Sequence, residues 1–348
     1  MTMKTVKTVL FFFLTITAGR VMAQTATAAV APAGACATPT TILKLATLAP
    51  EGTSLYKGLA SMKTDIKTKT NGCVDIQMFG GGQMGDEVDV VKKTRMGQLD
   101  GGALTGRGLS EIVPEVRVLE VPFLFSKSSQ IDLVYNNAAL KKEFQDKFAA
   151  KNFMLLGWAE AGLVQLFSTT PISSKKDLAG HKVWVWTGDE FANTFLTTLG
   201  LVGVSLAITD VQPSLQTHLI DTVYGPPLAA MAFQWPTVAK YMSKIDIVNA
   251  TGGLVISKAG FDKLTPAQQA VVKQSADEAT QKLVTQSRAD NQSAISVMQS
   301  SGVQVITPSP ENMAELKATS KEIQSKLVGV FFPQTLLDRI NTIIAAAP

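Results

Sequence analysis

The stretch "IDIVNATGGLVIS", residues 245–257, decides the fold. The sheet to which this extended segment belongs determines whether the chain returns from a second domain to the first. Ahead of it, "TILKLATL" (41–48), a helical stretch (54–70) and "VDIQMF" (74–79) alternate strand, helix and strand. This order is typical of a parallel sheet covered by helices. A second α/β unit starts with "KKDLAGHKVWVW" (175–186). We expect residues 245–257 to return to the first sheet, so that the second domain is inserted into the first.

A long helix is predicted to connect the two domains. Thr265, Pro266 and Gln268 form a capping-box start with proline at the first helical position, and no helix breaker follows until Gly302. The helix would run for about 35 residues, or roughly 50 Å, which exceeds the span of one small domain. The predicted fold is therefore α/β, with two domains, hinge strands and a long helix spanning both. Its predicted parts are a signal peptide (1–23), a flexible N-terminal segment (24–40), the first part of domain I (41–160), domain II (161–246), and a return to domain I (247–348) with the bridging helix at about 266–300 and C-terminal helices.

The start of the chain reads as an export signal. Lys4 and Lys7 precede an apolar run at 9–16, and the small-x-small pattern at 21–23 predicts cleavage after Ala23. A membrane anchor is the alternative, but the run is far shorter than the roughly 20 residues that span a bilayer. Since the signal carries three of the basic residues, the net charge of +4 falls to about +1 in the mature protein. Its charge therefore gives no sign of nucleic-acid binding.

Cys36 and Cys73 are the only cysteines of the chain. In an oxidising compartment they most simply form a disulfide, and both flank strands that are expected to be neighbours. Two free thiols are the alternative.

A glycine-rich loop raises the question of a dinucleotide site. Gly80, Gly82 and Gly85 match G-x-G-x-x-G between a strand and a helix, and Asp100 follows at a suitable distance. However, Asp100 falls at the start of the next strand, whereas a ribose lies at the carboxyl end. A lone glycine motif is also weak, because the loop needs glycine for ordinary turns. No cofactor is therefore expected.

Catalytic and metal-binding patterns are also lacking in the sequence. His181 and His218 are the only histidines, and neither has a partner at helical spacing, which disfavours a metal site. Glu160 with Glu51 or Asp189 could form a carboxylate pair for glycoside chemistry, but such pairs arise by chance in a chain of this size. We therefore expect that the protein is not an enzyme. Two domains, a crossing connection and an export signal instead indicate a hinged ligand-binding protein.

The order of several sequence blocks resembles the solute-binding proteins of TRAP transporters, the DctP-like family. The resemblance covers nearly the whole mature chain and implies the two-domain fold of a periplasmic solute receptor. Such a receptor is monomeric when isolated and delivers a small organic solute to a membrane permease driven by an ion gradient. The blocks are "LATLAPEGTSLYKG", "TNGCVDIQMFGGGQMGDEVDVVKKTRMGQLDGGALT", "GLSEIVPEVRVLEVPFLF", "KKDLAGHKVWV" and "LQTHLIDTVYGPP".

The resemblance also places the ligand contacts. Val164 occupies the position where most members of the family hold a carboxylate with arginine, and Trp184 replaces a second basic residue that often assists. Trp184 and Trp186 share one face of a strand, because side chains two apart point the same way. We expect that face to look into the cleft, with packing in the core as the alternative. Further positions expected at the cleft are Glu51, Thr105, Phe123, Glu160, Ile208, Tyr224 and Gly225.

These departures from the family pattern predict an unusual ligand. Neither valine nor tryptophan can form the bidentate hydrogen bonds that a guanidinium donates to a carboxylate. We therefore expect a neutral, apolar or aromatic-bearing solute. One alternative is a carboxylate receptor whose cation is Arg107 or Lys182, although Arg107 is expected to be solvated at the surface. The other alternative is a secreted hydrolase on the same two-domain scaffold.

Overall fold

The computed structural model describes residues 36–347 and confirms the predicted α/β fold with two sheets and a long helix. The predicted signal peptide, residues 1–23, and the first part of the flexible segment, residues 24–35, lie outside the described residues. Within the described range, no helix combines the length and the apolar character needed to cross a membrane.

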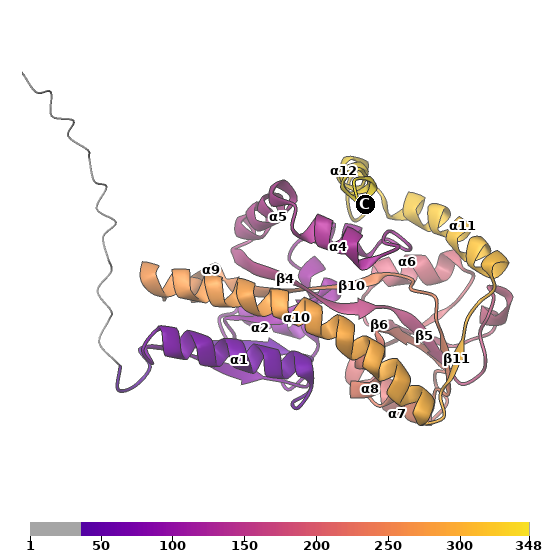
Figure 1. Ribbon diagram of the computed structural model, residues 1–348, viewed down its shortest axis with the longest axis horizontal. Helices are drawn as coiled ribbons and strands as arrows, with labels where there is room; N and C mark the ends of the chain where they lie inside the picture. Colours follow the sequence, from indigo (N-terminus) through magenta and orange to yellow (C-terminus); the bar gives the residue numbers. More distant parts are fainter. Residues whose placement is uncertain (1–35, 348) are drawn as a thin grey trace, which may run out of the picture. The chain divides into compact units, whose positions relative to one another are not determined.

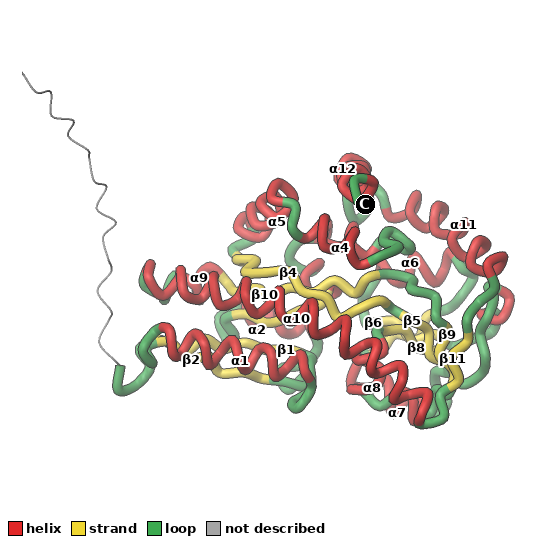
Figure 2. The backbone as a smooth tube through the Cα atoms, viewed as in Figure 1, coloured by secondary structure: helices red, strands yellow, loops and turns green. Residues whose placement is uncertain are grey.

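The first sheet has the strand order β2-β1-β3-β10-β4. Figure 2 shows its strands in yellow and labels β1, β2, β4 and β10. Its strands are β1 (Thr41–Thr47), β2 (Val74–Phe79), β3 (Gly101–Thr105), β4 (Phe153–Leu163) and β10 (Asn249–Ser257). Strand β1 is parallel to β2 and β3, whereas β10 is antiparallel to β3 and β4. Leu254 of β10 lies opposite Ala103 on one side and Gly157 on the other. The predicted return of the chain to this sheet is therefore confirmed.

Helices cover the first sheet and bury regularly spaced apolar side chains. They are α1 (Ser54–Lys69), α2 (Glu87–Arg95), α3 (Gly106–Ser110), the 3-10 helix η1 (Pro114–Glu120), α4 (Ser128–Tyr135), α5 (Ala138–Ala150) and α9 (Lys258–Phe261). In α5, Leu140, Phe144 and Phe148 recur every four residues and are buried, so one face of the helix packs on the core. The helix begins at Asn137, whose side chain accepts a hydrogen bond from the Leu140 amide.

The second sheet has the strand order β11-β9-β5-β8-β6-β7. Its strands are β5 (Gln165–Ser168), β6 (Val183–Trp186), β7 (Gly203–Leu206), β8 (Thr222–Gly225), β9 (Tyr241–Ser243) and β11 (Gln304–Ile306). Its helices are α6 (Glu190–Thr198), α7 (Ile208–Gln216), α8 (Pro227–Ala232) and the 3-10 turns η2 (Lys176–Leu178) and η3 (Trp235–Thr237). Strand β6 is parallel to β7 and β8, while β5 is antiparallel to β8 and β9.

The long helix α10 (Pro266–Ser300) contacts elements of both sheets, namely α1 and β4 on one side and α8 on the other (Figure 1). It starts at Thr265 with the predicted capping box. At Gly157 of β4, an added Cβ would lie 2.3 Å from Thr280 Oγ1. Glycine is therefore required where the helix crosses this strand.

The chain after α10 departs from the sequence prediction. Residues 247–348 were expected to stay with domain I, but β11 pairs in parallel with β9 of the second sheet. The reason is that α10 ends beside the second sheet, so the next strand joins the edge within reach. Helix α11 (Pro310–Leu327) then contacts α6, and α12 (Gln334–Ala345) contacts α4. The exact domain boundaries otherwise stay a prediction.

The predicted disulfide between Cys36 and Cys73 is confirmed. It attaches the segment before β1 to the start of β2, and the two Cα atoms lie 5.0 Å apart. The backbone supports the same contact, since the Cys36 amide donates to the Asn71 carbonyl at 3.0 Å.

Loss of this disulfide should destabilise the fold. The crosslink joins residues 37 apart, so on the chain-entropy account its removal should lower the free energy of unfolding by about 3 to 4 kcal/mol. Denaturant unfolding with and without dithiothreitol measures the difference. The double variant Cys36→Ser, Cys73→Ser is the control, because its midpoint should be low and insensitive to the reductant. A wild-type midpoint that reductant leaves unchanged would contradict this expectation.

Candidate ligand-binding site

A cavity of about 270 Å³ is walled by strands and helices of both sheets. All the predicted ligand-binding residues except Glu51 line it, and these are Thr105, Phe123, Glu160, Val164, Trp184, Trp186, Ile208, Tyr224 and Gly225. Glu51 lies instead in the exposed turn after β1, where its carboxylate accepts a 3.4 Å hydrogen bond from the Tyr56 hydroxyl. The structure thus brings together residues that lie more than 100 positions apart in the sequence.

Val164 marks the point where the chain passes from the first sheet to the second. Its amide donates to the Val248 carbonyl at 2.9 Å, and its carbonyl accepts from the Ile247 amide at 3.0 Å, so the outgoing and returning segments are paired. Phe123 joins them through a 2.7 Å hydrogen bond from its amide to the Ile247 carbonyl, and it has a φ of 57°. A left-handed backbone is unfavourable for a bulky residue and persists where the surroundings hold it. The valine therefore presents apolar surface to the cavity at a rigid crossing.

Helix α10 is bonded to this crossing through a partly buried cluster of ion pairs. Arg288 Nε donates to Glu160 Oε1 at 2.5 Å, and Arg288 Nη2 donates to Asp132 Oδ1 at 2.7 Å. Burial raises the pKa of the Glu160 carboxyl, and Arg288 opposes that shift. Glu160 is thus committed to a cation of its own chain.

Asn291 lies one helical turn further along α10 and contacts both sheets. Its Nδ2 donates to the Ala161 carbonyl at 2.8 Å at the end of β4. Its Oδ1 accepts from the Leu228 amide at 2.9 Å in α8. One amide side chain therefore binds elements on both sides of the crossing.

The two indoles of β6 share a face, as the alternation predicts. The Trp184 and Trp186 ring centroids lie 5.0 Å apart, and Trp184 also stacks on Tyr224 at 5.1 Å. Trp184 is only 1% exposed and packs in a core cluster, yet it belongs to the cavity wall as well. Its Nε1 donates to the Leu206 carbonyl at 3.0 Å. The Trp184 indole thus packs in the core and also forms part of the cavity wall.

Gly225 allows the Trp235 ring, which belongs to this aromatic cluster, to pack directly against the backbone. A Cβ at this position would lie 2.8 Å from Trp235 Cζ3, so a larger residue would displace that indole.

The sequence prediction that Arg107 is solvated at the surface is wrong. The residue is 6% exposed and lines the cavity. Its Nη1 donates to Glu111 Oε1 at 2.5 Å, and its Nη2 donates to the Thr187 carbonyl at 3.1 Å. It is buried because the loop after β6, which belongs to the second sheet, lies over it. Lys182, the other predicted cation, is exposed, bonds to the His218 carbonyl and does not line the cavity.

Arg117 was missed by the sequence analysis, although it lines the cavity and is 5% exposed. Its Nη2 donates to both Asp189 oxygens at 3.2 and 3.3 Å, and its Nη1 lies 3.2 Å from Glu120 Oε2. The guanidinium carbon stacks 4.2 Å above the Phe191 ring. The available signal was "VRVLEV", residues 116–121, where an arginine and a glutamate three apart interrupt an apolar run.

Two buried carboxyls complete the polar part of the wall. Glu87 accepts hydrogen bonds from the Thr105 amide, the Thr105 hydroxyl and the Gly108 amide, each at 2.7 Å, and so fixes the turn from β3 to α3. Glu120 accepts from the Thr251 amide at 3.1 Å and pairs with Arg117. Burial raises the pKa of both carboxyls to about 7. Both oxygens of each are directed at protein groups.

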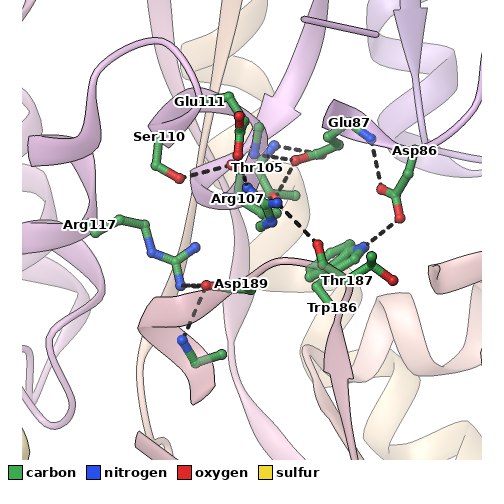
Figure 3. A network of polar contacts seen from close by, with 12 residues as sticks. Asp86, Glu87, Thr105, Arg107, Ser110, Glu111, Arg117, Trp186, Thr187 and Asp189 are labelled. Atoms are coloured by element: carbon green, nitrogen blue, oxygen red, sulfur yellow. Dashed lines mark hydrogen bonds and ion pairs between the residues drawn. The ribbon is translucent and has the colours of Figure 1, made fainter. Parts of the chain in front are cut away.

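Polar contacts link the two sides of the cavity (Figure 3). They are Asp86 Oδ2 with Trp186 Nε1 at 2.8 Å, Arg107 Nη2 with the Thr187 carbonyl at 3.1 Å, and Arg117 Nη2 with the Asp189 carboxylate. In each pair one residue belongs to the layer of the first sheet, and the other is the last residue of β6 or lies in the loop that follows it. Groups of the chain itself therefore connect the two sides of the described cavity. No cluster of three or more metal-ligating side chains occurs in the described range.

A cavity between two α/β layers, joined by paired crossing segments and one long helix, defines a solute-binding protein. The chain belongs to the family Bacterial extracellular solute-binding protein, family 7 (DctP), whose model matches residues 45–328. The predicted relation to the TRAP transporter receptors is confirmed. Members of this family are solute-binding components of transport and work with membrane permease subunits.

Relatives and solved structures agree with this assignment. The chain is 27% identical to the uncharacterized protein YiiZ of Salmonella typhimurium over 67% of this chain and 71% of that protein. It is 24% identical to the 2,3-diketo-L-gulonate-binding periplasmic protein YiaO of Escherichia coli over 70% of this chain and 74% of that protein. A TRAP periplasmic solute binding protein from Xanthobacter autotrophicus Py2, solved with bound β-D-galacturonate, is 25% identical, with a TM-score of 0.81 over 88% of this chain and 100% of that chain.

The raised pKa values of Glu87 and Glu120 predict that stability falls as pH rises. The folded chain holds these protons up to about pH 7, whereas the unfolded chain releases them near 4.5. Between those values the folded state binds more protons, so the free energy of unfolding decreases with increasing pH, by about 1 to 3 kcal/mol for each group. Thermal unfolding should therefore give a higher midpoint at pH 5 than at pH 7.5.

Glu87→Gln is the informative variant for this prediction. Glutamine cannot titrate, so the dependence on pH should be smaller than in the wild type. The variant should also be less stable, because the amide nitrogen cannot accept the hydrogen bonds that Thr105 and Gly108 donate. A wild-type midpoint that is equal or higher at pH 7.5 would show that these carboxyls ionise normally.

Proposed function

We propose that this solute-binding protein holds a small neutral solute with apolar or aromatic surface and delivers it to the permease subunits of a TRAP transporter. We further propose that it acts in the periplasm as a monomer, after export and cleavage following Ala23. The observation that carries the proposed ligand class is that both arginines of the cavity wall are already paired with groups of the chain.

The charge balance of the wall supports a neutral ligand. Arg107 is paired with Glu111, and Arg117 is paired with Asp189 and Glu120. A ligand carboxylate would have to displace one of these partners or lie close to it. Burying a charge without its own partner is unfavourable, so an uncharged solute is favoured.

The rest of the wall supports an apolar or aromatic contact surface. Val164, Ile208 and Phe123 contribute hydrocarbon, and the indoles contribute their ring faces. The Trp184 and Trp186 N–H groups already donate within the chain, so they offer few new hydrogen bonds. Affinity would come mainly from apolar surface removed from water, at about 25 cal/mol per Å².

A carboxylate receptor with an unusual cation is the second candidate. It is favoured by the relatives, since one is named for 2,3-diketo-L-gulonate and another is solved with β-D-galacturonate. In this chain such binding would require Arg107 to leave Glu111, or Arg117 to leave Asp189. Lys182 is a poorer choice because it does not line the cavity.

A ligand screen by thermal unfolding separates the two candidates. Neutral aromatic and aliphatic amides and alcohols are compared with D-galacturonate and small carboxylates, each with and without 0.5 M NaCl. A neutral ligand at about 100 times its Kd should stabilise the protein by about 2.7 kcal/mol, with little effect of salt. Stabilisation by the acids alone, weakened by salt, would contradict the proposal.

Two variants show which cation acts if an acid binds. Arg107→Met removes a cation of the wall, whereas Lys182→Met removes one outside it and is the matched control. If Arg107 is the cation of the carboxylate alternative, only the first variant should lose acid binding, by about tenfold or more.

A further inference from the structure

We propose that Asp189 determines the specificity of this receptor by acting as a built-in counter-ion for Arg117, so that the closed cavity rejects carboxylates. This inference rests on the proposed function and deepens it. It assigns the rejection of anions to one residue, and it predicts that removing that charge turns Arg117 into a carboxylate site.

The geometry of the pair resembles that of an arginine with a bound anion. Arg117 Nη2 lies 3.3 Å from Asp189 Oδ1 and 3.2 Å from Asp189 Oδ2, and both side chains are buried in the cavity wall. Arg117 belongs to η1 over the first sheet, whereas Asp189 belongs to the loop after β6 of the second (Figure 3). The carboxylate that pairs with this guanidinium therefore belongs to the opposite wall of the cavity.

Arg117 is otherwise prepared to bind an anion. Its plane stacks on the Phe191 ring at 4.2 Å, which fixes its orientation. Its Nε has no hydrogen-bond partner among the described residues, so one donor remains available. A rigid guanidinium with a spare donor is well suited to two-point recognition of a planar carboxylate. What opposes an incoming anion is the negative charge of Asp189.

Asp189 also begins helix α6, but this role does not require its charge. Its Oδ1 accepts a 3.1 Å hydrogen bond from the Ala192 amide, as expected of an N-cap residue. Asparagine and serine cap helices about as well as aspartate. Asp189→Asn therefore removes the charge while keeping the cap and nearly the same volume.

The experiment uses benzoate and benzamide, which have almost the same shape and differ in charge. Their affinities are measured by calorimetry and by the fluorescence of the cavity tryptophans for the full mature chain and its variants. In the wild type, benzamide should bind more tightly than benzoate. In Asp189→Asn, the ratio of benzoate to benzamide affinity should rise by about tenfold or more, because Arg117 is released.

Matched controls identify the groups involved. Glu190→Gln makes the same change of charge one residue further on, at an exposed position outside the cavity wall, and should keep the wild-type ratio. The double variant Arg117→Gln, Asp189→Asn should lose the gain, because the released cation is gone. If Asp189→Asn does not fold, Asp189→Ser provides the same test with the cap retained.

The possible outcomes separate this inference from the proposed function. A folded Asp189 variant with no benzoate binding, or with the same ratio as Glu190→Gln, overturns the counter-ion role. A gain that persists in the double variant overturns it too, since Arg117 is then not the cation. Wild-type preference for benzoate would overturn the neutral-ligand proposal and with it the rejection of carboxylates, whereas the pairing of Asp189 with Arg117 is judged by the change of the affinity ratio between variants.

Discussion

Val164 lies where the chain leaves the first sheet, and it forms two backbone hydrogen bonds with residues 247 and 248, where the chain returns. These bonds hold the two segments side by side. The rest of the structure depends on this pairing. It places the carboxyl ends of β3 and β6 on either side of one cavity. Phe123, held in a left-handed backbone against the same segment, belongs to this junction and to the cavity wall at once.

The elements that could be predicted from the sequence are those specified by local patterns. The capping box at Thr265 predicts α10, and the alternation around Trp184 predicts the two faces of β6. Burial of the wall arginines could not be predicted in this way. Arg107 and Arg117 bind groups 80 and 72 residues away, on the opposite sheet, and no local pattern reports such partners. Similarly, the place of β11 follows from where a long helix ends in space.

The site shows why family membership and ligand class have to be argued separately. The family is defined by the two sheets, the crossing segments and the long helix, all of which this chain has. The ligand depends on which polar groups of the wall remain unsatisfied. Here Glu120 and Asp189 are directed at Arg117, and Glu87 is directed at Thr105 and Gly108. Much of the remaining wall consists of hydrocarbon and ring faces.

The contacts of Asn291 have a mechanical consequence. Its amide nitrogen binds β4 and its amide oxygen binds α8, so a single side chain of α10 senses the spacing between the two sheets. Opening of the cavity must either stretch one of these bonds or carry the helix along with α8. Helix α10, which lines the cavity through Thr280 and Leu283, is therefore tied mechanically to both sides of that cavity.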